Sequence, residues 1–400
     1  MLGFDIAEEQ KMAKQAAQEF AKRLAPQRDK ILLHKDKNGY KSLHDEAWKG
    51  MAELGLFGCL IPEKYGGNGM GLLTETMMME EIAGQGLGSP VIVTTTMDVC
   101  CLLRVGSEAL KQKYLPKVAS GETMLSFGLT EPDAGSNSVR IKTEAKKDGN
   151  VYRLTGQKIF ITGADWTDSM LVVARTTSYE DTVKQKKPRF YGLSLFMVDL
   201  KKSKGITLSK IPIHGFEGAE QFVVFFDNVE VPAENLVYKE NEGGVALFNS
   251  LNPERIIAAA DALGISEFAM RRAVDYAKQR KVFKDTPIGA YQAIQHPLAE
   301  SRIQVEAARL LTYRAAWTYD KGAPVPEVGK WANMAKLAAS DAAIKTVDSA
   351  LETLGGYAFS EEYGIVHLWD MARILKTIPI SREMVLNFVG EHVLGLPKSY

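Results

Sequence analysis

Cysteine is scarce in this chain. The 400 residues include three cysteines, Cys59 and the adjacent pair Cys100 and Cys101. Adjacent cysteines are poorly placed to bridge to each other, and no Cys-x-x-Cys spacing indicates a metal site. Few and unpatterned cysteines are typical of a reducing compartment. We therefore expect a cytoplasmic protein without a metal site.

An excess of charge and long apolar runs are also missing. Lysine plus arginine and aspartate plus glutamate each total 49, so the formal net charge is zero. This balance argues against binding to nucleic acid or to an anionic membrane surface. No run reaches the roughly 18 apolar residues that a membrane-spanning helix needs, and the polar amphipathic start is unlike a signal peptide. We expect no nucleic-acid partner and no membrane span.

The glycine fingerprint of the classical dinucleotide-binding fold is absent as well. The glycines of "GGNGMG" and "GQGLG" do not have the spacing Gly-x-Gly-x-x-Gly. The sequence therefore argues against a Rossmann-type nucleotide site.

The chain does contain three segments of different texture. Residues 1–124 carry apolar side chains at helical spacing. Residues 125–240 contain short β-branched and aromatic runs separated by Gly, Asn, Asp and Pro, which predict five or more antiparallel strands. Residues 241–400 return to alanine-rich helical patterns. The expected fold class is α+β multidomain, with an N-terminal all-α domain, a middle antiparallel β-domain and a C-terminal four-helix bundle in these ranges.

Two segments carry more local expectations. Residues 178–190 are rich in charge and are expected to form a solvated loop between two strands. Residues 243–283 keep apolar residues at helical spacing and are expected to form one long helix.

The β-domain opens with "FGLTEPDAGSNSVR" (127–140), and this stretch resembles the flavin-binding signature of the acyl-CoA dehydrogenases. Five further stretches follow in the order of that family: "KIFITGADW", "FFDNVEVP", "LNPERIIAA", "QRKVF" and "ETLGGYAFSEEYGI". The resemblance covers almost the whole chain. It implies FAD as cofactor, an acyl-CoA substrate, a homotetramer and an electron-transfer flavoprotein as the electron acceptor.

The resemblance also implies a set of cofactor and substrate residues. Those placed at the flavin ring or pyrophosphate are Phe127, Leu129, Thr130, Ser136, Phe160 and Thr162. Those placed at the cofactor of a neighbouring subunit, at the adenine end or elsewhere on the cofactor are Arg280, Phe283, Gln292, Glu352, Gly355, Gly356, Ser381 and Glu383. Arg255 and Ser136 are placed at the substrate. Taken singly, each is also explained as an ordinary strand, core or cap residue, so the ordered set carries the flavin prediction.

Two positions of the chain depart from the family pattern. Glu352 stands where the family usually has Gln, and Lys284 stands where it usually has Gly. Both departures affect local contacts with the cofactor and leave the assignment in place.

The usual catalytic base of the family is missing. In most members a Glu in the pattern Tyr-Glu-Gly-Thr takes the α-proton of the thioester. The matching stretch here is "ILKTIPISREM", and setting Ser381 against the Thr places Pro379 at the Glu position. Proline also has no N–H, whereas the family uses the N–H at this position to hold the thioester carbonyl. Losing one such donor can cost roughly 2.7–4 kcal/mol.

Two other carboxylates could replace that base. Glu254 directly precedes Arg255, as does the base of the isovaleryl and long-chain members, although an acid in a first helical turn is also favoured by the helix dipole. Asp98 lies in the apolar run "VIVTTTMDVCCLLRVG", where an ionised carboxylate is costly unless it is paired or used. A structural pairing with Arg104, or exposure to solvent, would also explain Asp98.

Three functions stay open from the sequence. The first is dehydrogenation of an alicyclic CoA ester with Asp98 as base, because the subgroup acting on cyclohexene-carboxyl-CoA lacks the usual Glu and uses an Asp from this region. The second is ordinary α,β-dehydrogenation of a short or branched acyl-CoA with Glu254 as base. The third is a flavin- and acyl-CoA-binding protein that acts as a non-catalytic partner or as a reductase component.

Overall fold

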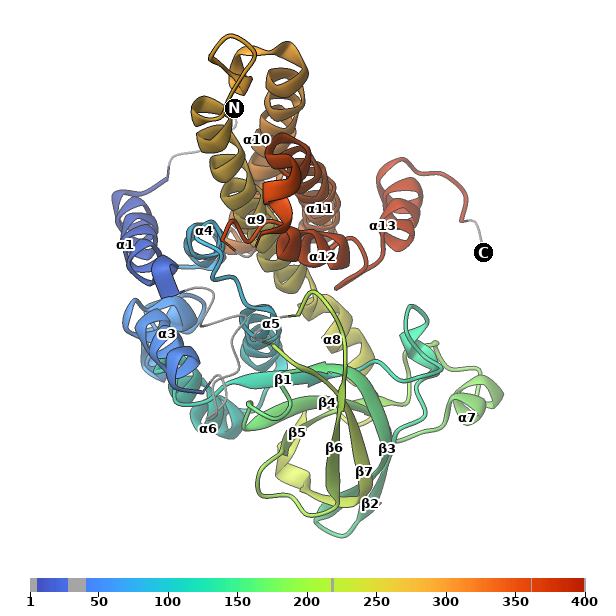
Figure 1. The fold of residues 1–400 in the computed structure, drawn as a ribbon. Helices are drawn as coiled ribbons and strands as arrows, with labels where there is room; N and C mark the ends of the chain where they lie inside the picture. Colours follow the sequence, from blue (N-terminus) through green and yellow to red (C-terminus); the bar gives the residue numbers. More distant parts are fainter. Residues whose placement is uncertain (1–5, 28–40, 217–218, 361, 399–400) are drawn as a thin grey trace. The chain divides into compact units, whose positions relative to one another are not determined.

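The computed structural model describes residues 6–27, 41–216, 219–360 and 362–398. In chain order, helices come first, strands follow from Leu125, and helices return from Gly243, which confirms the expected fold class (Figure 1). The chain divides into two compact units. The sheet unit comprises residues 48–69 and 90–254, and the helical unit comprises 1–47, 70–89 and 255–400.

The sheet unit is built on one eight-stranded sheet. Seven strands follow the order β6-β7-β3-β2-β4-β5-β8, and β1 pairs with β4 beside that path. The strands are β1 (Leu125–Gly128), β2 (Glu144–Asp148), β3 (Val151–Thr162), β4 (Ser169–Arg175), β5 (Leu193–Asp199), β6 (Ile206–Ile211), β7 (Gln221–Pro232) and β8 (Leu236–Val237).

Most strand pairs are antiparallel, as the sequence predicts, but β1–β4 and β2–β4 are parallel. A parallel pair needs a crossover rather than a tight turn. The β2–β3 hairpin lies in the chain between β1 and β4 and supplies the length for that crossover.

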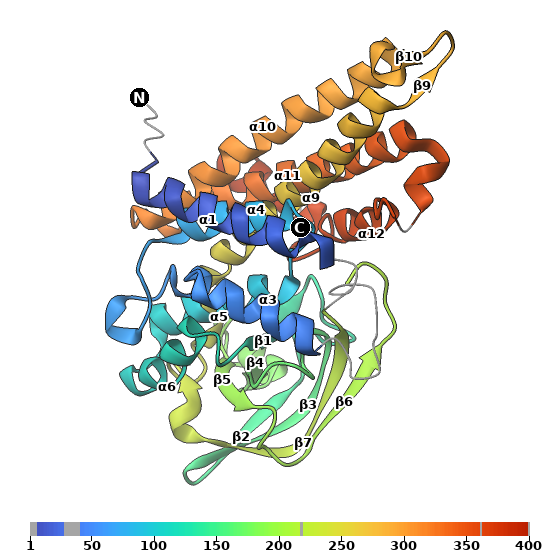
Figure 2. The same cartoon turned by 60° about the vertical axis from the view of Figure 1, so that its left-hand side comes forward.

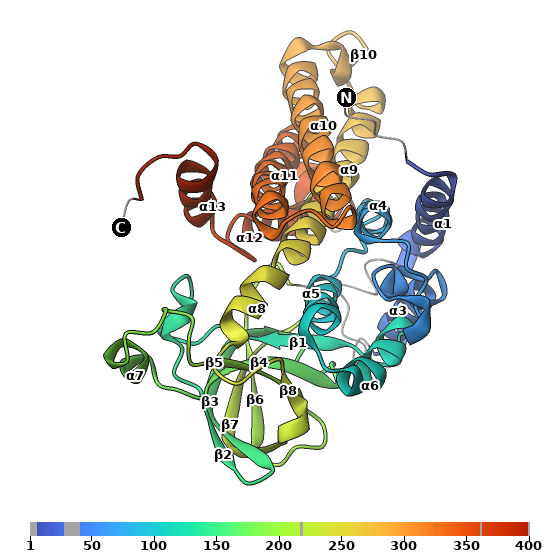
Figure 3. The same ribbon diagram turned by 180° about the vertical axis from the view of Figure 1, so that it is seen from behind.

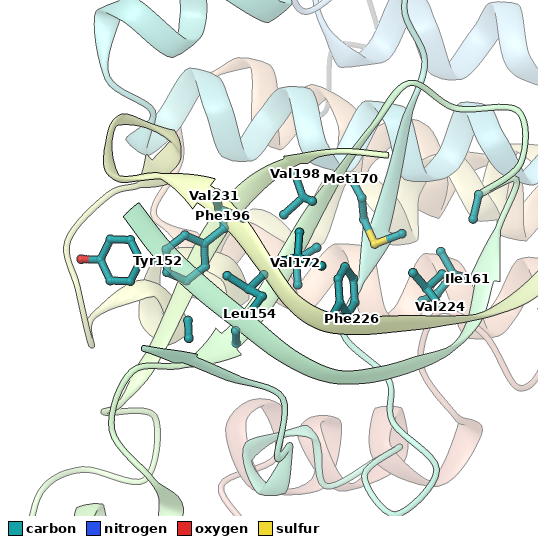
Figure 4. Close-up of a cluster of buried hydrophobic side chains, with 14 of the residues drawn as sticks. Tyr152, Leu154, Ile161, Met170, Val172, Phe196, Val198, Val224, Phe226 and Val231 are labelled. Carbon is teal, nitrogen blue, oxygen red and sulfur yellow. The ribbon is translucent and has the colours of Figure 1, made fainter. Parts of the chain in front are cut away.

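The sheet encloses a core of its own side chains. Figure 4 shows aromatic and aliphatic residues from β3, β4, β5 and β7 pointing toward one another. Tyr152 and Phe196 meet with ring centroids 4.8 Å apart, and every residue of β4 is buried. Alternate residues of β4, namely Met170, Val172 and Ala174, belong to this core, because successive side chains of a strand point to opposite faces.

Helices α5 (Pro90–Val105), α6 (Glu108–Ala119), α7 (Tyr179–Lys184) and α8 (Gly243–Ser250) belong to the same unit. Helix α5 packs against β1 and α8 (Figure 3). The Thr95 hydroxyl donates to the Leu125 carbonyl at 3.1 Å, and the Leu125 N–H donates back to it at 3.3 Å. This exchange ties α5 to the strand that opens the flavin signature.

The expectation of a simple loop over 178–190 was wrong, because α7 forms there. Ser178 caps this helix and accepts from the Asp181 N–H at 3.0 Å. Glu180 and Asp181 lie in the first turn, where acids are favoured. The charges that suggested a solvated loop are therefore also helix-start signals.

The helical unit consists mainly of helices. They are α1 (Glu8–Leu24), α4 (Leu72–Ala83), α9 (Asn252–Gln279), α10 (Gln292–Asp320), α11 (Val325–Leu354), α12 (Val366–Ile374) and α13 (Arg382–Phe388), with α3 (Lys41–Glu53) and α9 crossing the boundary between units. Of these, α9, α10 and α11 are the longest. Figure 2 shows the short strands β9 (Lys281–Val282) and β10 (Thr286–Pro287) joining α9 to α10. Helices α10 and α11 pack along each other.

The expectation of one helix over 243–283 was also wrong. The chain forms α8 and α9 with a break at Leu251. Pro253 lies in the first turn of α9, where its missing N–H has no cost. Without an N–H, Pro253 cannot donate to the carbonyl four residues before it, so α8 does not continue through Pro253 and the break falls at Leu251.

Charged side chains fasten α4, α9 and α10 together. Arg309 binds Glu80 at 2.7 Å and Glu267 at 2.5 Å, and the Tyr313 hydroxyl donates to Glu80 at 2.7 Å. Asp320 at the end of α10 accepts from the N–H groups of Leu72 and Leu73 and so caps α4. In the described residues, no helix is long and apolar enough to cross a membrane.

Candidate active site

A buried ion pair supports the loop that follows β1. The Lys158 ammonium donates to the Leu129 carbonyl at 3.1 Å and to Glu131 at 2.8 Å. Glu131 also accepts from the N–H groups of Lys142 and Thr143, at 2.6 and 2.9 Å. Both charged side chains are buried. The pair therefore fixes Leu129, a predicted flavin contact.

Burial and pairing shift the pKa values of both Lys158 and Glu131. Desolvation lowers the pKa of Lys158 to about 8, against the opposing effect of Glu131. Burial alone would raise the pKa of Glu131, but Lys158 and the hydrogen bonds keep that pKa below its usual value. Sequence reasoning missed this pair. The available signals were Lys158 inside the strand-forming stretch "QKIFIT" and Glu131 shortly after the strand-forming residues that open the flavin signature.

The second part of this site lies at the end of β3. The Thr130 carbonyl accepts from the Ile159 N–H at 2.9 Å, which brings the signature loop beside Phe160. Phe160 has a φ of 58° and is 53% exposed. Thr162 accepts a hydrogen bond from Gln221 at 2.9 Å. Phe127 is half-buried and Ser136 is exposed.

These features fit a flavin. A non-glycine residue at positive φ is strained by about 1–3 kcal/mol, and such strain concentrates at functional sites. Here it presents an aromatic ring to the surface beside hydroxyl and backbone groups. The sheet unit therefore offers an aromatic and polar surface, formed by Thr130, Phe160 and Thr162, on which a planar ring could pack.

Asp98 is the most unusual carboxyl of the sheet unit. It is completely buried on α5, and neither carboxylate oxygen has a hydrogen-bond partner among the described residues. Arg104 is exposed. Neither solvent nor a hydrogen bond to Arg104 therefore accounts for Asp98. Desolvation raises the pKa of this carboxyl well above its usual range, and the charge of Glu254 raises it further.

The surroundings of Asp98 come from α5, α8 and the start of α9. Cys101, one turn along α5, is hydrogen-bonded to Ser250, the last residue of α8. Burial raises the pKa of the Cys101 thiol to about 12, and Asp98 adds to this effect. Glu254 lies in the first turn of α9 and is half-buried. The two candidate bases are thus close enough for the charge of Glu254 to affect the pKa of Asp98.

The remaining predicted cofactor residues lie in the helical unit. Arg280, Phe283 and Gln292 gather around the α9–α10 connection, where Phe283 is 83% exposed at a φ of 32°. At the end of α11, Gly355 has a φ of 58°. A Cβ added at Gly355 or Gly356 would meet nothing within 4 Å. The open backbone beside the exposed Glu352 fits the close approach of a ligand.

The last group surrounds the position of the missing base. Pro379 lies between α12 and α13, and Ser381 caps α13 by accepting from the Met384 N–H at 3.4 Å. Glu383 is exposed in the first turn of α13, and Arg255 is half-buried in α9. Sequence reasoning missed Lys336, whose ammonium donates to the Ile380 carbonyl at 2.6 Å. Its sequence signal was a lysine at a core-facing position of α11.

Comparisons with known proteins agree with these features. Three family models match: the acyl-CoA dehydrogenase N-terminal domain over residues 7–122, the middle domain over 126–229 and the C-terminal domain over 241–394. The acyl-CoA dehydrogenase FadE12 of Mycobacterium tuberculosis is 42% identical over 89% of both chains. The cyclohex-1-ene-1-carbonyl-CoA dehydrogenase of Syntrophus aciditrophicus is 33% identical over 98% of this chain and 91% of its own.

A solved structure extends the likeness to three dimensions. The glutaryl-coenzyme A dehydrogenase–glutaryl-CoA complex has a TM-score of 0.89 and 32% identity, covering 100% of this chain and 98% of that one. With family models over almost its whole length, the chain belongs to the acyl-CoA dehydrogenase family and is an FAD-dependent oxidoreductase that dehydrogenates acyl-CoA.

Proposed function

We propose that this enzyme dehydrogenates an alicyclic CoA thioester of the cyclohex-1-ene-1-carboxyl-CoA type, with Asp98 as the catalytic base. The main support is the Asp98 carboxyl, which is fully buried and whose two oxygens have no hydrogen-bond partner among the described residues. Pro379, at the usual base position, offers no carboxylate. The likeness to the cyclohexene-carbonyl-CoA enzyme of Syntrophus aciditrophicus supports the same substrate class.

The chemistry matches a base that acts away from the α-carbon. In a ring ester whose double bond is conjugated with the thioester, the γ-hydrogen is acidic because its loss gives a dienolate. Asp98 accepts that proton, so the C–H bond breaks, an O–H bond forms, and the electron pair enters the conjugated system. Bound FAD supplies the acceptor for the hydride that leaves another ring carbon. The net reaction is a 1,4-elimination of two hydrogens.

A buried carboxyl with a raised pKa suits this task. A base is most effective when its pKa approaches the working pH. Desolvation and the charge of Glu254 both move the pKa of Asp98 upward from the ordinary range of aspartate. In its ionised form Asp98 is therefore a stronger base than an exposed aspartate.

A second candidate function is α,β-dehydrogenation of a short or branched acyl-CoA with Glu254 as base. The observation in its favour is that Glu254 is half-buried beside Asp98 and directly before Arg255, the proposed substrate residue.

We assign the cofactor and substrate residues as the sequence predicts. In the sheet unit, Thr130 and Thr162 would bond the flavin ring, Phe160 would pack on it, and Ser136 would meet the pyrophosphate and the substrate. Phe127 and Leu129 complete this set. The helical-unit residues proposed to hold the cofactor, including that of a neighbouring subunit, are Arg280, Phe283, Gln292, Glu352, Gly355, Gly356, Ser381 and Glu383.

The proposal includes a homotetramer that works in the cytoplasm and passes electrons to an electron-transfer flavoprotein. An exposed apolar stripe on α10 supports assembly. Ile303, Leu310 and Trp317 are 69%, 56% and 38% exposed at seven-residue spacing. Such spacing keeps side chains on one face of a helix, and an exposed apolar face favours contact with another subunit.

Anaerobic flavin bleaching tests the proposed function. The purified holoenzyme is mixed with CoA thioesters, including cyclohex-1-ene-1-carboxyl-CoA, cyclohexane-carboxyl-CoA and linear or branched acyl-CoAs. We expect bleaching by a cyclic ester, with loss of bleaching in Asp98→Asn and retention in Glu254→Gln. Asp261→Asn is the matched control, because Asp261 is another buried aspartate with an unpartnered oxygen.

Other bleaching results would contradict Asp98 as the base or the cyclic substrate. Bleaching that survives Asp98→Asn and is lost in Glu254→Gln would assign the base to Glu254. If none of these thioesters bleaches the wild-type flavin, the proposed substrate class is wrong.

A further inference from the structure

Lys336 is a buried lysine at the core-facing side of α11. Its side chain is 1% exposed, and its ammonium donates to the Ile380 carbonyl at 2.6 Å. Lysine is rarely buried to this extent without a specific partner. The partner here is the residue directly after Pro379, at the position of the missing base.

Asp341 holds the same segment from both sides. It lies five residues further along α11 and binds Lys376 at 2.7 Å and Arg382 at 2.6 Å. These two residues flank the turn from Thr377 to Ser381. Helix α11 therefore contacts the turn itself at Ile380 and the residues on either side of it, Lys376 and Arg382.

The charges around Lys336 belong largely to the proposed site. Desolvation and, second, the positive charge of Arg255 lower the pKa of Lys336 to about 8. Asp341 and Glu383 raise the pKa, and Lys376 lowers it. Arg255 is the proposed substrate residue, and Glu383 is a proposed cofactor residue. Lys336 is thus placed among the charges of this part of the helical unit.

We propose that Lys336 is a positioning residue, whose ammonium fixes the Thr377–Ser381 turn and thereby sets how Ser381 and Glu383 bind FAD. The inference rests on the proposed function for the assignment of Ser381 and Glu383 to the cofactor. It goes beyond that function by giving α11 a role in a turn where proline has replaced the usual base and its N–H.

The protonation of Lys336 has a measurable consequence. A hydrogen bond from a charged donor is stronger than one from a neutral donor. Loss of the proton near pH 8 therefore weakens the hold on the Ile380 carbonyl. FAD release should accelerate as the pH rises through this value.

The experiment measures FAD release from the diluted holoenzyme by the gain of free-flavin fluorescence, from about pH 6.5 to about pH 9.5. Lys336→Met removes the donor, and Lys336→Gln keeps an uncharged donor. We expect release at the lower pH to rise about ten- to one-hundred-fold in Lys336→Met, as for a lost hydrogen bond from a charged group. The pH step near 8 should become smaller in both variants, because each removes the contribution of the Lys336 ammonium.

Lys345→Met is the matched control. Lys345 lies on the same helix, where its ammonium binds Glu300 at 2.9 Å and its side chain is 35% exposed. We expect this variant to release FAD at the wild-type rate and to keep the pH step. Equal effects of Lys345→Met and Lys336→Met, or a pH step of undiminished size in Lys336→Gln, would overturn the proposal. A smaller step that remains belongs to Lys158, whose pKa is also about 8 and whose ammonium holds the Leu129 carbonyl.

Asp341→Asn keeps the test decisive if the Lys336 variants do not fold. Removing the negative charge of Asp341 lowers the pKa of Lys336, so the step should move to lower pH. A step that stays in place contradicts the proposal. FAD release needs no substrate, so failure of every thioester to bleach the flavin would refute the proposed function separately.

Discussion

At the scale of single residues, Asp98 and Glu254 form a coupled pair whose pH dependence can be measured. Desolvation and then the charge of Glu254 raise the pKa of Asp98. A general base must be ionised, so kcat/KM should rise as the pH rises through this pKa. Glu254→Gln removes a negative neighbour, and we expect it to move the acid limb to lower pH with turnover retained.

Above the acid limb, where wild-type Asp98 is ionised, Asp98→Asn should lower kcat by about 10²–10⁴-fold, the usual contribution of a general base. The measurement is steady-state turnover of the bleaching substrate against pH, with wild type and Asp261→Asn alongside. An unmoved acid limb in Glu254→Gln would show that the carboxylates are not coupled.

Asp261 makes a second pH-dependent contribution at this scale, to stability. Burial raises its pKa to about 7, and one oxygen has no hydrogen-bond partner among the described residues. The unfolded aspartate ionises near pH 4 and the folded one near pH 7, so stability is present at low pH and falls between these values. The raised pKa of Asp261 corresponds to a loss of roughly 4 kcal/mol in folding stability once the pH is above 7.

We expect Asp261→Asn to have a more favourable effect on Tm at pH 8 than at pH 5. Only the wild-type side chain must either stay protonated or ionise inside the protein. Thermal unfolding at the two pH values gives the comparison, with the exposed Asp227→Asn as the control. An identical change in Tm at both values would contradict the assignment of a raised pKa.

At the scale of elements, the Glu131–Lys158 pair joins the signature loop to β3. Glu131→Gln leaves the buried Lys158 ammonium without its counter-charge, and breaking a buried pair typically costs about 3–5 kcal/mol. We expect a lower Tm together with weaker retention of FAD, because the Leu129 carbonyl depends on the same ammonium.

Glu144→Gln provides the matched control for this element. Glu144 binds Lys146 at 2.7 Å in an exposed pair on β2. Exposed pairs contribute about 0–1 kcal/mol, so Tm and FAD retention should change little. Equal losses in the two variants, by calorimetry and flavin absorbance, would show that burial of the Glu131 pair has no special effect.

The elements also show what sequence patterns can predict. Periodicity located most helices and strands because α-helices and strands place apolar residues with different repeats. It missed the break at Leu251, because apolar spacing continues across the break. The break comes instead from Pro253, which has no N–H to donate within a helix. It missed α7 because a short capped helix and a charged loop have similar compositions.

At the scale of the whole molecule, predictability depended on ordered motifs. The family and cofactor followed from six stretches in a fixed order, none of which is decisive alone. Lys158 and Lys336 were missed because their partners, Glu131 and the Ile380 carbonyl, are 27 and 44 residues away. Burial and pairing across such separations depend on tertiary packing, which local patterns do not encode.

Assembly gives the remaining prediction at this scale. Ile303, Leu310 and Trp317 form an exposed apolar stripe on α10. A buried charge without a partner is costly at an interface, so Leu310→Glu should convert the proposed homotetramer to smaller species. Met12→Glu is the control, because Met12 is 68% exposed on α1 and lies outside the stripe. Light scattering coupled to size exclusion measures both masses; a tetramer that persists in Leu310→Glu would exclude the stripe as an essential contact.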